Sequence, residues 1–190
     1  MTNEPIYSQD WMSNNIPVWQ EMLKEFEKVD EWFFLEIGCF EGRTTRWMLD
    51  TYPNVCVAVI DTFEGGADQK DLDTSNLREK FMHNIHPHSS RVKVFQYRSD
   101  QILREMADDG SECEFIYVDG SHEYADVLND ARLSFEICAH GGLICFDDYG
   151  WEVDPVVENR PKRAIDEFLA SHAQELEVLH KQYQVWVRKR

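Results

Sequence analysis

The chain has 190 residues, of which 43% are hydrophobic and 13% aromatic, and this composition predicts one domain with a full-sized core. Its 36 acidic and 19 basic side chains give a formal net charge of −17. Such a charge repels phosphate backbones and anionic lipids, so nucleic acid and membrane surfaces are poor candidates for partners.

The cysteines and the apolar runs indicate a cytoplasmic protein. None of the five cysteines forms a Cys-x-x-Cys pair, and four lie in or beside apolar runs, so we expect reduced core thiols rather than a disulfide or zinc framework. The N-terminus is acidic and polar, unlike a signal peptide, and no apolar stretch approaches the roughly 18 residues of a membrane span.

The first half of the chain alternates helical and strand-like patterns. Ile16, Trp19, Leu23 and Phe26 recur at helical spacing, which predicts an amphipathic helix over residues 14–29, within a segment 1–30 that packs on the domain. The elements expected next are a strand over 32–38, a helix over 43–52, a strand over 55–60, a loop from residue 64 and a helix around 77–85.

The second half continues the alternation and completes the fold class. We expect strands at 92–95, 115–118 and 143–146, helices around 100–107, 123–138 and 161–173, and two final strand-like runs at 176–180 and 183–188. This order predicts a single α/β domain over residues 1–190, with a mixed sheet of about seven strands and helices on both faces. The tight turn between the last two runs makes the last strand antiparallel.

A glycine-rich turn follows the first strand and reads Glu36-Ile-Gly38-Cys-Phe-Glu-Gly42. Sheets of this class build a cofactor site at such a turn. The spacing differs from the Gly-x-Gly-x-x-Gly of dinucleotide sites, and the lysine of a P-loop is missing. Because an acid stands where the first glycine would be, the turn suits a cationic ligand better than a pyrophosphate. S-adenosylmethionine, with an ammonium and a sulfonium, fits this description.

Polar residues follow the other strands at their carboxyl ends, which meet at one edge of a parallel sheet. They are Asp61, Ser99, Asp100, Asp119, Asp147 and Asp148. Any one of them is equally well explained as a helix cap or turn former. The adjacent pair Asp147-Asp148 is harder to explain as cap or turn residues, because two carboxylates repel each other unless a cation lies between them. With Asp119 they offer three oxygen ligands, which favour Mg²⁺, Mn²⁺ or Ca²⁺ over zinc.

His122 lies three residues after Asp119, where a helix is expected to begin. A helix N-terminus disfavours imidazolium, so the ring is expected to be neutral near pH 7 and suited to act as a general base. The alternative is a capping or surface histidine without a chemical role.

Over roughly residues 32–188 the chain resembles the class I S-adenosylmethionine-dependent methyltransferases. The resemblance rests on the turn Glu36–Gly42, on Asp61, on Asp119-Gly-Ser-His122 and on Gly141-Gly-Leu-Ile-Cys-Phe-Asp147-Asp148-Tyr149. The chain is most similar to the metal-dependent O-methyltransferases of the catechol type and of the macrocin (sugar) type.

The resemblance implies a role for each site residue. Glu36, Gly38 and Gly42 border the methionine part of the cofactor, Asp61 receives the ribose hydroxyls, and Ser99 or Asp100 lies by the adenine. Asp119 adjoins the cofactor and, with Asp147 and Asp148, holds Mg²⁺ or Mn²⁺. His122 stands where the catechol enzymes place a lysine base. Two positions depart from the family pattern: Ser121 replaces an acidic base of some sugar enzymes, and Asp148 replaces an asparagine of the catechol enzymes.

These roles imply a metal-assisted O-methyltransferase that acts on a hydroxyl of a small polyol, with a sugar preferred over a catechol. Tyr149, Trp151 and the loop 64–75 are expected to cover this acceptor, and homo-oligomerisation stays open. One alternative is a catalytically silent module that binds a partner, which the three aspartates and His122 argue against. Another is a metal-dependent hydrolase or hydroxylase relative, which would not need the acid at Glu36.

Overall fold

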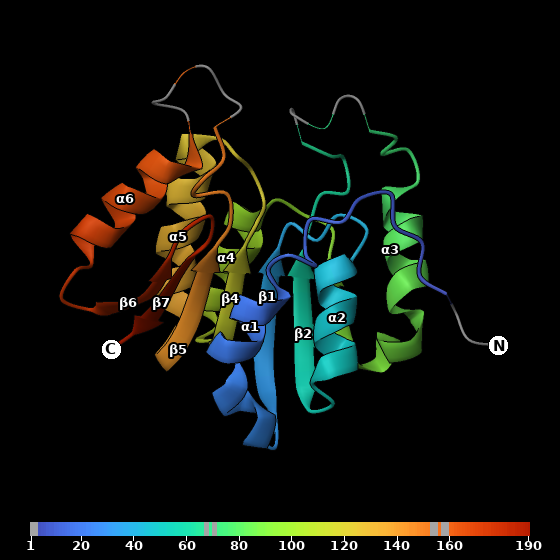
Figure 1. The fold of residues 1–190 in the computed structure, drawn as a ribbon, viewed down its shortest axis with the longest axis horizontal. Helices are drawn as coiled ribbons and strands as arrows, with labels where there is room; N and C mark the ends of the chain where they lie inside the picture. The colour runs from blue at the N-terminus through green and yellow to red at the C-terminus, as the bar shows by residue number, and fades with distance from the viewer. Residues whose placement is uncertain (1–3, 67–68, 70–71, 153–155, 157–159) are drawn as a thin grey trace.

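The computed structural model describes residues 4–66, 69, 72–152, 156 and 160–190 (Figure 1). Its centre is a seven-stranded sheet with the order β3-β2-β1-β4-β5-β7-β6. The strands are β1 (Trp32–Ile37), β2 (Val55–Ile60), β3 (Val92–Phe95), β4 (Cys113–Val118), β5 (Cys138–Phe146), β6 (Leu176–Lys181) and β7 (Val185–Lys189). Strands β1 to β5 are parallel, and β7 pairs antiparallel with both β5 and β6. The predicted fold class is confirmed.

Helices cover both faces of the sheet, and each face has its own apolar core. One core includes α1 (Ile16–Met22), the 3₁₀ turn η1 (Lys24–Lys28), α2 (Arg43–Thr51) and α3 (Leu77–Ile85), which the 3₁₀ turn η2 (His86–Arg91) follows. The other includes α4 (Ser99–Asp108), α5 (Tyr124–Ile137) and α6 (Pro161–Ser171). Alternate residues of β1 serve the two cores, with Phe34 on the first and Leu35 on the second.

The structure corrects some element boundaries. The helix expected over 14–29 is two shorter elements, because Leu23 leaves helical geometry at φ −94° and ψ 5°. This break lets both Leu23 and Phe26 reach the core. Strand β5 begins at Cys138, which was expected to be the last residue of the helix over 123–138, since Cys138 adopts an extended conformation after α5. Of the expected covering loop 64–75, residues 67–68 and 70–71 lie outside the described residues.

Trp19 of α1 ties the N-terminal part of the chain to the sheet. Its ring makes edge contacts with Phe34, Phe115, Tyr117 and Trp186, at centroid distances from 4.8 to 6.4 Å. Its indole Nε1 donates a 2.9 Å hydrogen bond to Oε1 of Gln184. Because these partners lie on β1, β4 and β7 or directly before β7, α1 is held across the centre of the sheet.

All five cysteines are free, and four of them are buried, as expected for core thiols. Among the described helices, none has both the length and the apolarity that a membrane span requires.

Candidate cofactor and metal site

A cavity of about 920 Å³ opens at the carboxyl ends of the parallel strands. Strand β1 lies between β2 and β4, so the direction in which the chain adds strands reverses there, and ligands of open α/β sheets bind at such a point. Four residues that directly follow these strands each donate a backbone N–H to a carbonyl oxygen of the neighbouring strand. The bonds run from Gly38 to Ile60, from Asp61 to Phe95, from Asp119 to Ile37 and from Asp147 to Val118, at 2.9 to 3.1 Å. The predicted strand-end residues therefore do meet at one edge.

Gly38 is required by the close approach of two strand ends. Its φ is +80°, and an added Cβ would lie 2.1 Å from the carbonyl oxygen of Asp119. A side chain here would thus push the end of β4 away from the end of β1. Gly42 has another role: at φ +76° it begins α2, and an added Cβ would lie 2.6 Å from the ring of Phe81 in α3. Gly38 lines the cavity and Gly42 does not.

Asp61 lines the cavity and also shapes its wall. Its Oδ2 accepts hydrogen bonds from the backbone N–H groups of Cys39, at 2.8 Å, and Phe40, at 3.0 Å. Its Oδ1 accepts one from Phe63 at 2.7 Å. Phe40 and Phe63 have left-handed backbone angles, at φ 47° and 57°, which bulky residues rarely adopt. The carboxylate of Asp61 therefore stabilises two strained residues of the glycine-rich turn and the following loop.

Glu36 lies behind the glycine-rich turn rather than in the cavity wall. The side chain is 1% exposed, and the hydroxyl of Thr45 in α2 donates a hydrogen bond to it. Burial raises the pKa of Glu36 to about 8; the Thr45 bond opposes this shift, and the nearby charge of Asp61 adds to it. The acid that marks the motif thus acts here as a buried link between β1 and α2.

The residues after β3 divide into one that faces the cavity and one that does not. Ser99 lines the cavity, and its hydroxyl donates a 2.7 Å hydrogen bond to Oδ1 of Asp130 on α5. Asp100 is outside the wall and pairs with Arg98 at 3.2 Å. Asp130 was not among the predicted site residues. The sequence carries a signal for it, namely an acid between Val127 and Ala131 on the buried face of a predicted helix.

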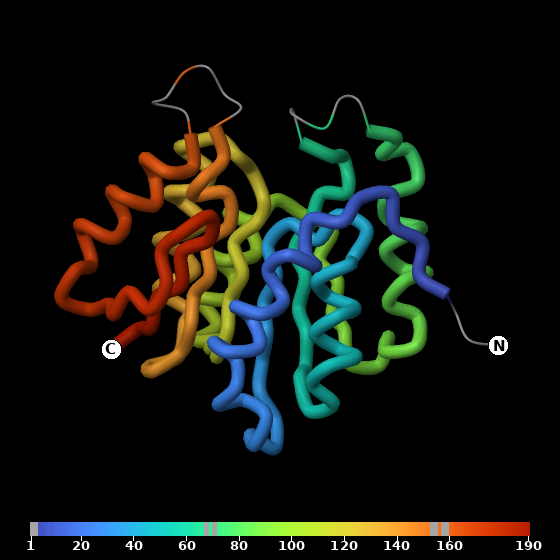
Figure 2. Tube along the Cα trace, viewed as in Figure 1, coloured from blue at the N-terminus to red at the C-terminus, as the bar shows by residue number. Residues whose placement is uncertain are grey.

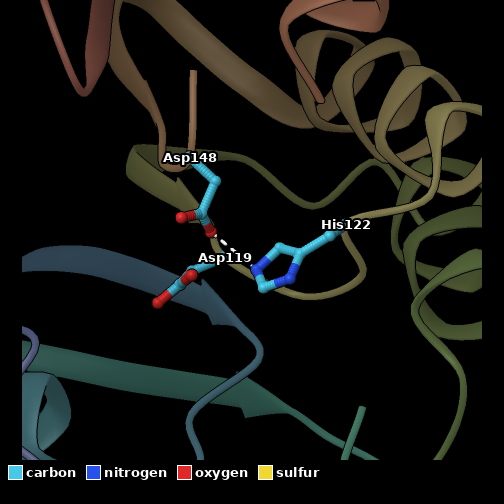
Figure 3. Close-up of side chains that lie close together, drawn as sticks. All are labelled: Asp119, His122 and Asp148. Atoms are coloured by element: carbon cyan, nitrogen blue, oxygen red, sulfur yellow. Dashed lines mark ion pairs between the residues drawn. The ribbon is translucent and has the colours of Figure 1, made fainter. Parts of the chain in front are cut away.

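Three side chains converge in the part of the cavity wall that follows β4 and β5, away from Ser99, as Figure 3 shows. Asp119, His122 and Asp148 each offer one ligand atom, and these atoms all lie within 4.8 Å of one another. Nε2 of His122 is 2.7 Å from Oδ2 of Asp148, and the hydroxyl of Tyr183 donates to Oδ1 of Asp148 at 2.8 Å. Asp148 has φ 57°, a left-handed conformation that aspartate tolerates better than most residues.

Asp147 borders the cavity beside this cluster, with its carboxylate held from three sides. The hydroxyl of Tyr117 and Nε2 of Gln184, at 3.1 Å, donate to Oδ2, and the N–H of Asp148 donates to Oδ1 at 2.8 Å. Gln184 in turn accepts from Trp19, so a chain of hydrogen bonds runs from α1 to Asp147. Sequence spacing suggested three aspartates as ligands, whereas the folded chain groups His122 with Asp119 and Asp148.

The electrostatics of this end favour a cation. Burial raises the pKa of Asp119 well above its ordinary value, and the charges of Asp147 and Asp148 raise it further. Burial, followed by the charge of Asp148, raises the pKa of Asp147 to about 6, although its hydrogen bonds oppose the shift. A divalent cation would relieve this repulsion, and carboxylate oxygens are the donors that suit Mg²⁺, Ca²⁺ and Mn²⁺. The residues present therefore fit a metal ion.

The N-terminal segment before α1 forms one wall of the cavity, which the sequence did not indicate. Figure 2 shows the course of this segment, in dark blue, from beside α3 to α1. The buried carboxylate of Glu41 accepts from the N–H of Ser8 at 2.6 Å and pairs with Lys80 at 2.9 Å. Asp10 pairs with Arg43 at 2.6 Å. Aromatic rings complete the rim. The ring centroids of Trp11 and Phe40 are 5.0 Å apart, and those of Trp151 and His122 are 4.7 Å apart.

Comparison with known proteins gives one family match and one sequence relative. A family profile described as a methyltransferase domain matches residues 35–149. The uncharacterized protein R132 of Acanthamoeba polyphaga mimivirus is 29% identical over 131 residues, which are 68% of this chain and 57% of that protein.

Solved structures with the same fold include methyltransferases. The MycE methyltransferase of the mycinamycin biosynthetic pathway, solved with Mg, SAH and mycinamycin VI, superposes with a TM-score of 0.70 at 16% identity, over 96% of this chain and 51% of that one. An O-methyltransferase from Bacillus cereus, solved with SAH, gives 0.66 at 14% identity, over 97% and 84%. The chain thus spans only about half the length of R132 and MycE.

Proposed function

This chain belongs to the family of proteins that carry the methyltransferase domain, and we propose that it transfers a methyl group from S-adenosylmethionine to a hydroxyl of a small polyol. The observation that carries the proposal is the position of the Asp119–His122–Asp148 cluster in the wall of the same cavity that the glycine-rich turn lines. A cofactor site and a site for a divalent cation then share one space.

The cofactor placement follows the sheet order. The methionine part would lie over Gly38, which lines the cavity, and the ribose would lie by Asp61. The adenine lies by Ser99, three strands from β4 along the sheet. Glu36 acts on the cofactor through the turn that it holds from behind. The S-adenosylhomocysteine bound to the Bacillus cereus O-methyltransferase supports this cofactor class.

Asp119 and Asp148 would hold Mg²⁺ or Mn²⁺, with Asp147 as the third carboxylate at this end. A bound divalent cation lowers the pKa of a hydroxyl that it contacts. Tyr183 and Tyr117 fix the directions of Asp148 and Asp147, so both carboxylates are positioned before any ligand arrives. The Mg in the MycE complex supports a metal in this fold.

His122 has two uses that exclude each other, because one Nε2 atom cannot both bind a metal and take a proton. We propose that it is the general base at Nε2: the Asp148 carboxylate, 2.7 Å from Nε2, stabilises the ring once it has taken the proton, and Trp151 packs beside the ring at the cavity wall. His122→Gln should then lower kcat on the order of 10²–10⁴-fold while metal affinity stays close to that of the wild type. Loss of metal affinity in this variant would make His122 a ligand instead.

A sugar is our proposed acceptor class. The cavity wall carries far more acids than bases, and its arginines are paired, Arg43 with Asp10 and Arg98 with Asp100, so a neutral polyol suits it better than an anion. The mycinamycin VI in the MycE complex supports a small-molecule acceptor by analogy of fold. A catechol is the second candidate, because the Trp151 ring beside His122 offers a flat wall to a planar diol.

The test combines S-adenosylmethionine, Mg²⁺ or Mn²⁺ and a panel of vicinal diols that includes sugars and catechols, with mass spectrometry to detect the gain of one methyl group. We expect transfer that stops in EDTA, returns with the metal and is lost in Asp119→Asn. Asp109→Asn, an exposed residue after α4, is the matched control and should retain activity. Full activity in chelator would remove the metal from the proposal. Thermal stabilisation by NADH and not by S-adenosylhomocysteine would overturn the cofactor assignment.

A further inference from the structure

Trp19 of α1 and Gln184, in the turn before β7, form a buried pair that reaches Asp147 although neither residue borders the cavity. They are 165 residues apart in the sequence, and their exposed fractions are 0% and 3%. Nε1 of Trp19 donates to Oε1 of Gln184 at 2.9 Å, and Nε2 of Gln184 donates to Oδ2 of Asp147 at 3.1 Å. The pair therefore connects a helix near the N-terminus with an acid that follows β5.

The indole of Trp19 determines which way the amide of Gln184 points. An indole N–H can only donate a hydrogen bond, so the amide oxygen must face Trp19 and the NH₂ group must face Asp147. The reverse orientation would place two donors together at Trp19 and would place a carbonyl oxygen against the carboxylate. Because both ends of the amide are engaged, only one of its two similar orientations is favourable.

Trp19 also contacts the second donor to the same carboxylate oxygen. Its ring packs edge-on against Tyr117, with centroids 4.8 Å apart, and the hydroxyl of Tyr117 donates to Oδ2 of Asp147. A carboxylate oxygen has two lone pairs, so the donors from Tyr117 and Gln184 fill those of Oδ2. Oδ1 accepts one bond, from the N–H of Asp148 at 2.8 Å. The remaining lone pair of Asp147 is then on Oδ1.

We propose that Trp19 and Gln184 are positioning residues for the divalent cation, and that they hold Asp147 in the direction that offers its remaining lone pair to an ion at this end of the cavity. The inference rests on the proposed function for the presence of the ion. A carboxylate that is already held loses less conformational freedom when an ion binds, so its supporting partners raise the metal affinity.

Titration with Mn²⁺ alone, followed by electron paramagnetic resonance of the free ion, tests the inference. Gln184→Met keeps the length of the side chain but removes both hydrogen bonds, and should lower the Mn²⁺ affinity on the order of tenfold to a hundredfold. Trp19→Phe keeps an aromatic ring beside Tyr117 and removes the indole N–H, and should lower the affinity about threefold to tenfold. The affinity for S-adenosylhomocysteine should not change in either variant.

Trp32→Phe is the matched control for the loss of volume in the core. Trp32 is also 0% exposed and belongs to the same apolar core as Trp19. Its Nε1 has no hydrogen-bond partner among the described residues, so this variant loses ring volume without losing such a bond. We expect a loss of thermal stability in Trp32→Phe with the Mn²⁺ affinity of the wild type.

A double variant tests whether Trp19 acts through Gln184. Gln184→Met already breaks the connection to Asp147, so adding Trp19→Phe should lower the Mn²⁺ affinity by less than about a further twofold. A further loss as large as that in the wild-type background would show that Trp19 does not act through Gln184.

The other outcomes also have distinct meanings. Equal losses of Mn²⁺ affinity in Trp19→Phe and Trp32→Phe would assign the effect to a loosened core and overturn the inference. Unchanged affinity in Gln184→Met would overturn it and leave the metal site intact. If the wild-type protein does not bind Mn²⁺, the metal part of the proposed function fails and this inference with it. Should Trp19→Phe not fold, benzothienylalanine at this position, which has sulfur in place of the indole N–H, serves the same comparison.

Discussion

The hydroxyl of Tyr183, in the turn between β6 and β7, donates a 2.8 Å hydrogen bond to Oδ1 of Asp148, directly after β5. Nε2 of His122 lies 2.7 Å from the other oxygen of the same carboxylate. The antiparallel hairpin at the end of the chain thus orients an acid that follows the parallel part of the sheet. Asp148 is held from both sides in a left-handed conformation, and each side can be tested separately.

Tyr183→Phe should weaken metal-dependent catalysis without abolishing it. The ring stays, but one hydrogen bond to Asp148 is lost, and a bond to a charged group is worth about 1.5–3 kcal/mol at most. We expect kcat/KM to fall about threefold to a hundredfold, with cofactor affinity unchanged, in steady-state assays and calorimetry. Tyr97→Phe, on the same rim after β3, is the control. Equal losses in both variants would contradict a specific role for Tyr183.

Gln184→Leu should destabilise the fold, because Gln184 is 3% exposed and uses both ends of its amide. Its removal leaves Nε1 of Trp19 without an acceptor and takes one donor from Asp147. Two such losses in the interior amount to about 2–5 kcal/mol in the free energy of unfolding, measured in urea. Gln182→Leu, in the exposed part of the same turn, should change it by less than about 0.5 kcal/mol.

Gly38→Ala separates a steric clash from backbone strain. At Gly38 a Cβ would meet the Asp119 carbonyl oxygen at 2.1 Å, whereas Gly110 has φ +70° and nothing within 4 Å of an added Cβ. Gly110→Ala should therefore lower the free energy of unfolding only by the cost of a left-handed alanine, about 1–2 kcal/mol. Gly38→Ala should lower it clearly more and should also weaken cofactor binding. The measurements are urea unfolding and titration with S-adenosylhomocysteine. Similar losses in the two variants would contradict the close approach of β1 and β4.

Glu36→Gln should flatten the pH dependence of stability. The pKa of Glu36 in the folded protein, about 8, lies above its ordinary value of 4.5, so the folded state binds the proton more tightly than the unfolded state does. The stability from this group is fully present below pH 4.5 and is lost as the pH rises through 8. The glutamine variant keeps a neutral partner for Thr45 and has no such loss.

The melting temperature of the variant, measured without ligand, should therefore fall less between pH 5 and 8.5 than that of the wild type. The exposed Glu105→Gln in α4 should follow the wild-type profile. Parallel profiles for wild type and Glu36→Gln would mean that Glu36 is ionised throughout this range in the folded protein.

The sequence by itself determined the fold class and the edge of the sheet that carries the site. Apolar runs of strand length, helical periodicity and the turn Glu36–Gly42 are local patterns. They can be recognised in the sequence because they do not depend on contacts between distant residues. Helix α3 was predicted with its observed bounds for the same reason. Strand ends that carry acids must meet at one edge whenever the strands are parallel, so Asp61, Asp119 and Asp148 could be placed together in advance.

Only the tertiary structure decided which of these residues share one space. The grouping of His122 with Asp119 and Asp148, while Asp147 is held by Tyr117 and Gln184, depends on side-chain directions and on a hairpin at the far end of the chain. The position of Glu36 behind the turn depends on the packing of α2 against β1. The N-terminal wall and the Ser99–Asp130 pair arise from contacts between segments about 30 or more residues apart, such as the bond of Ser8 to Glu41. Such contacts leave no periodicity in the sequence, because they depend on how packed elements meet in space.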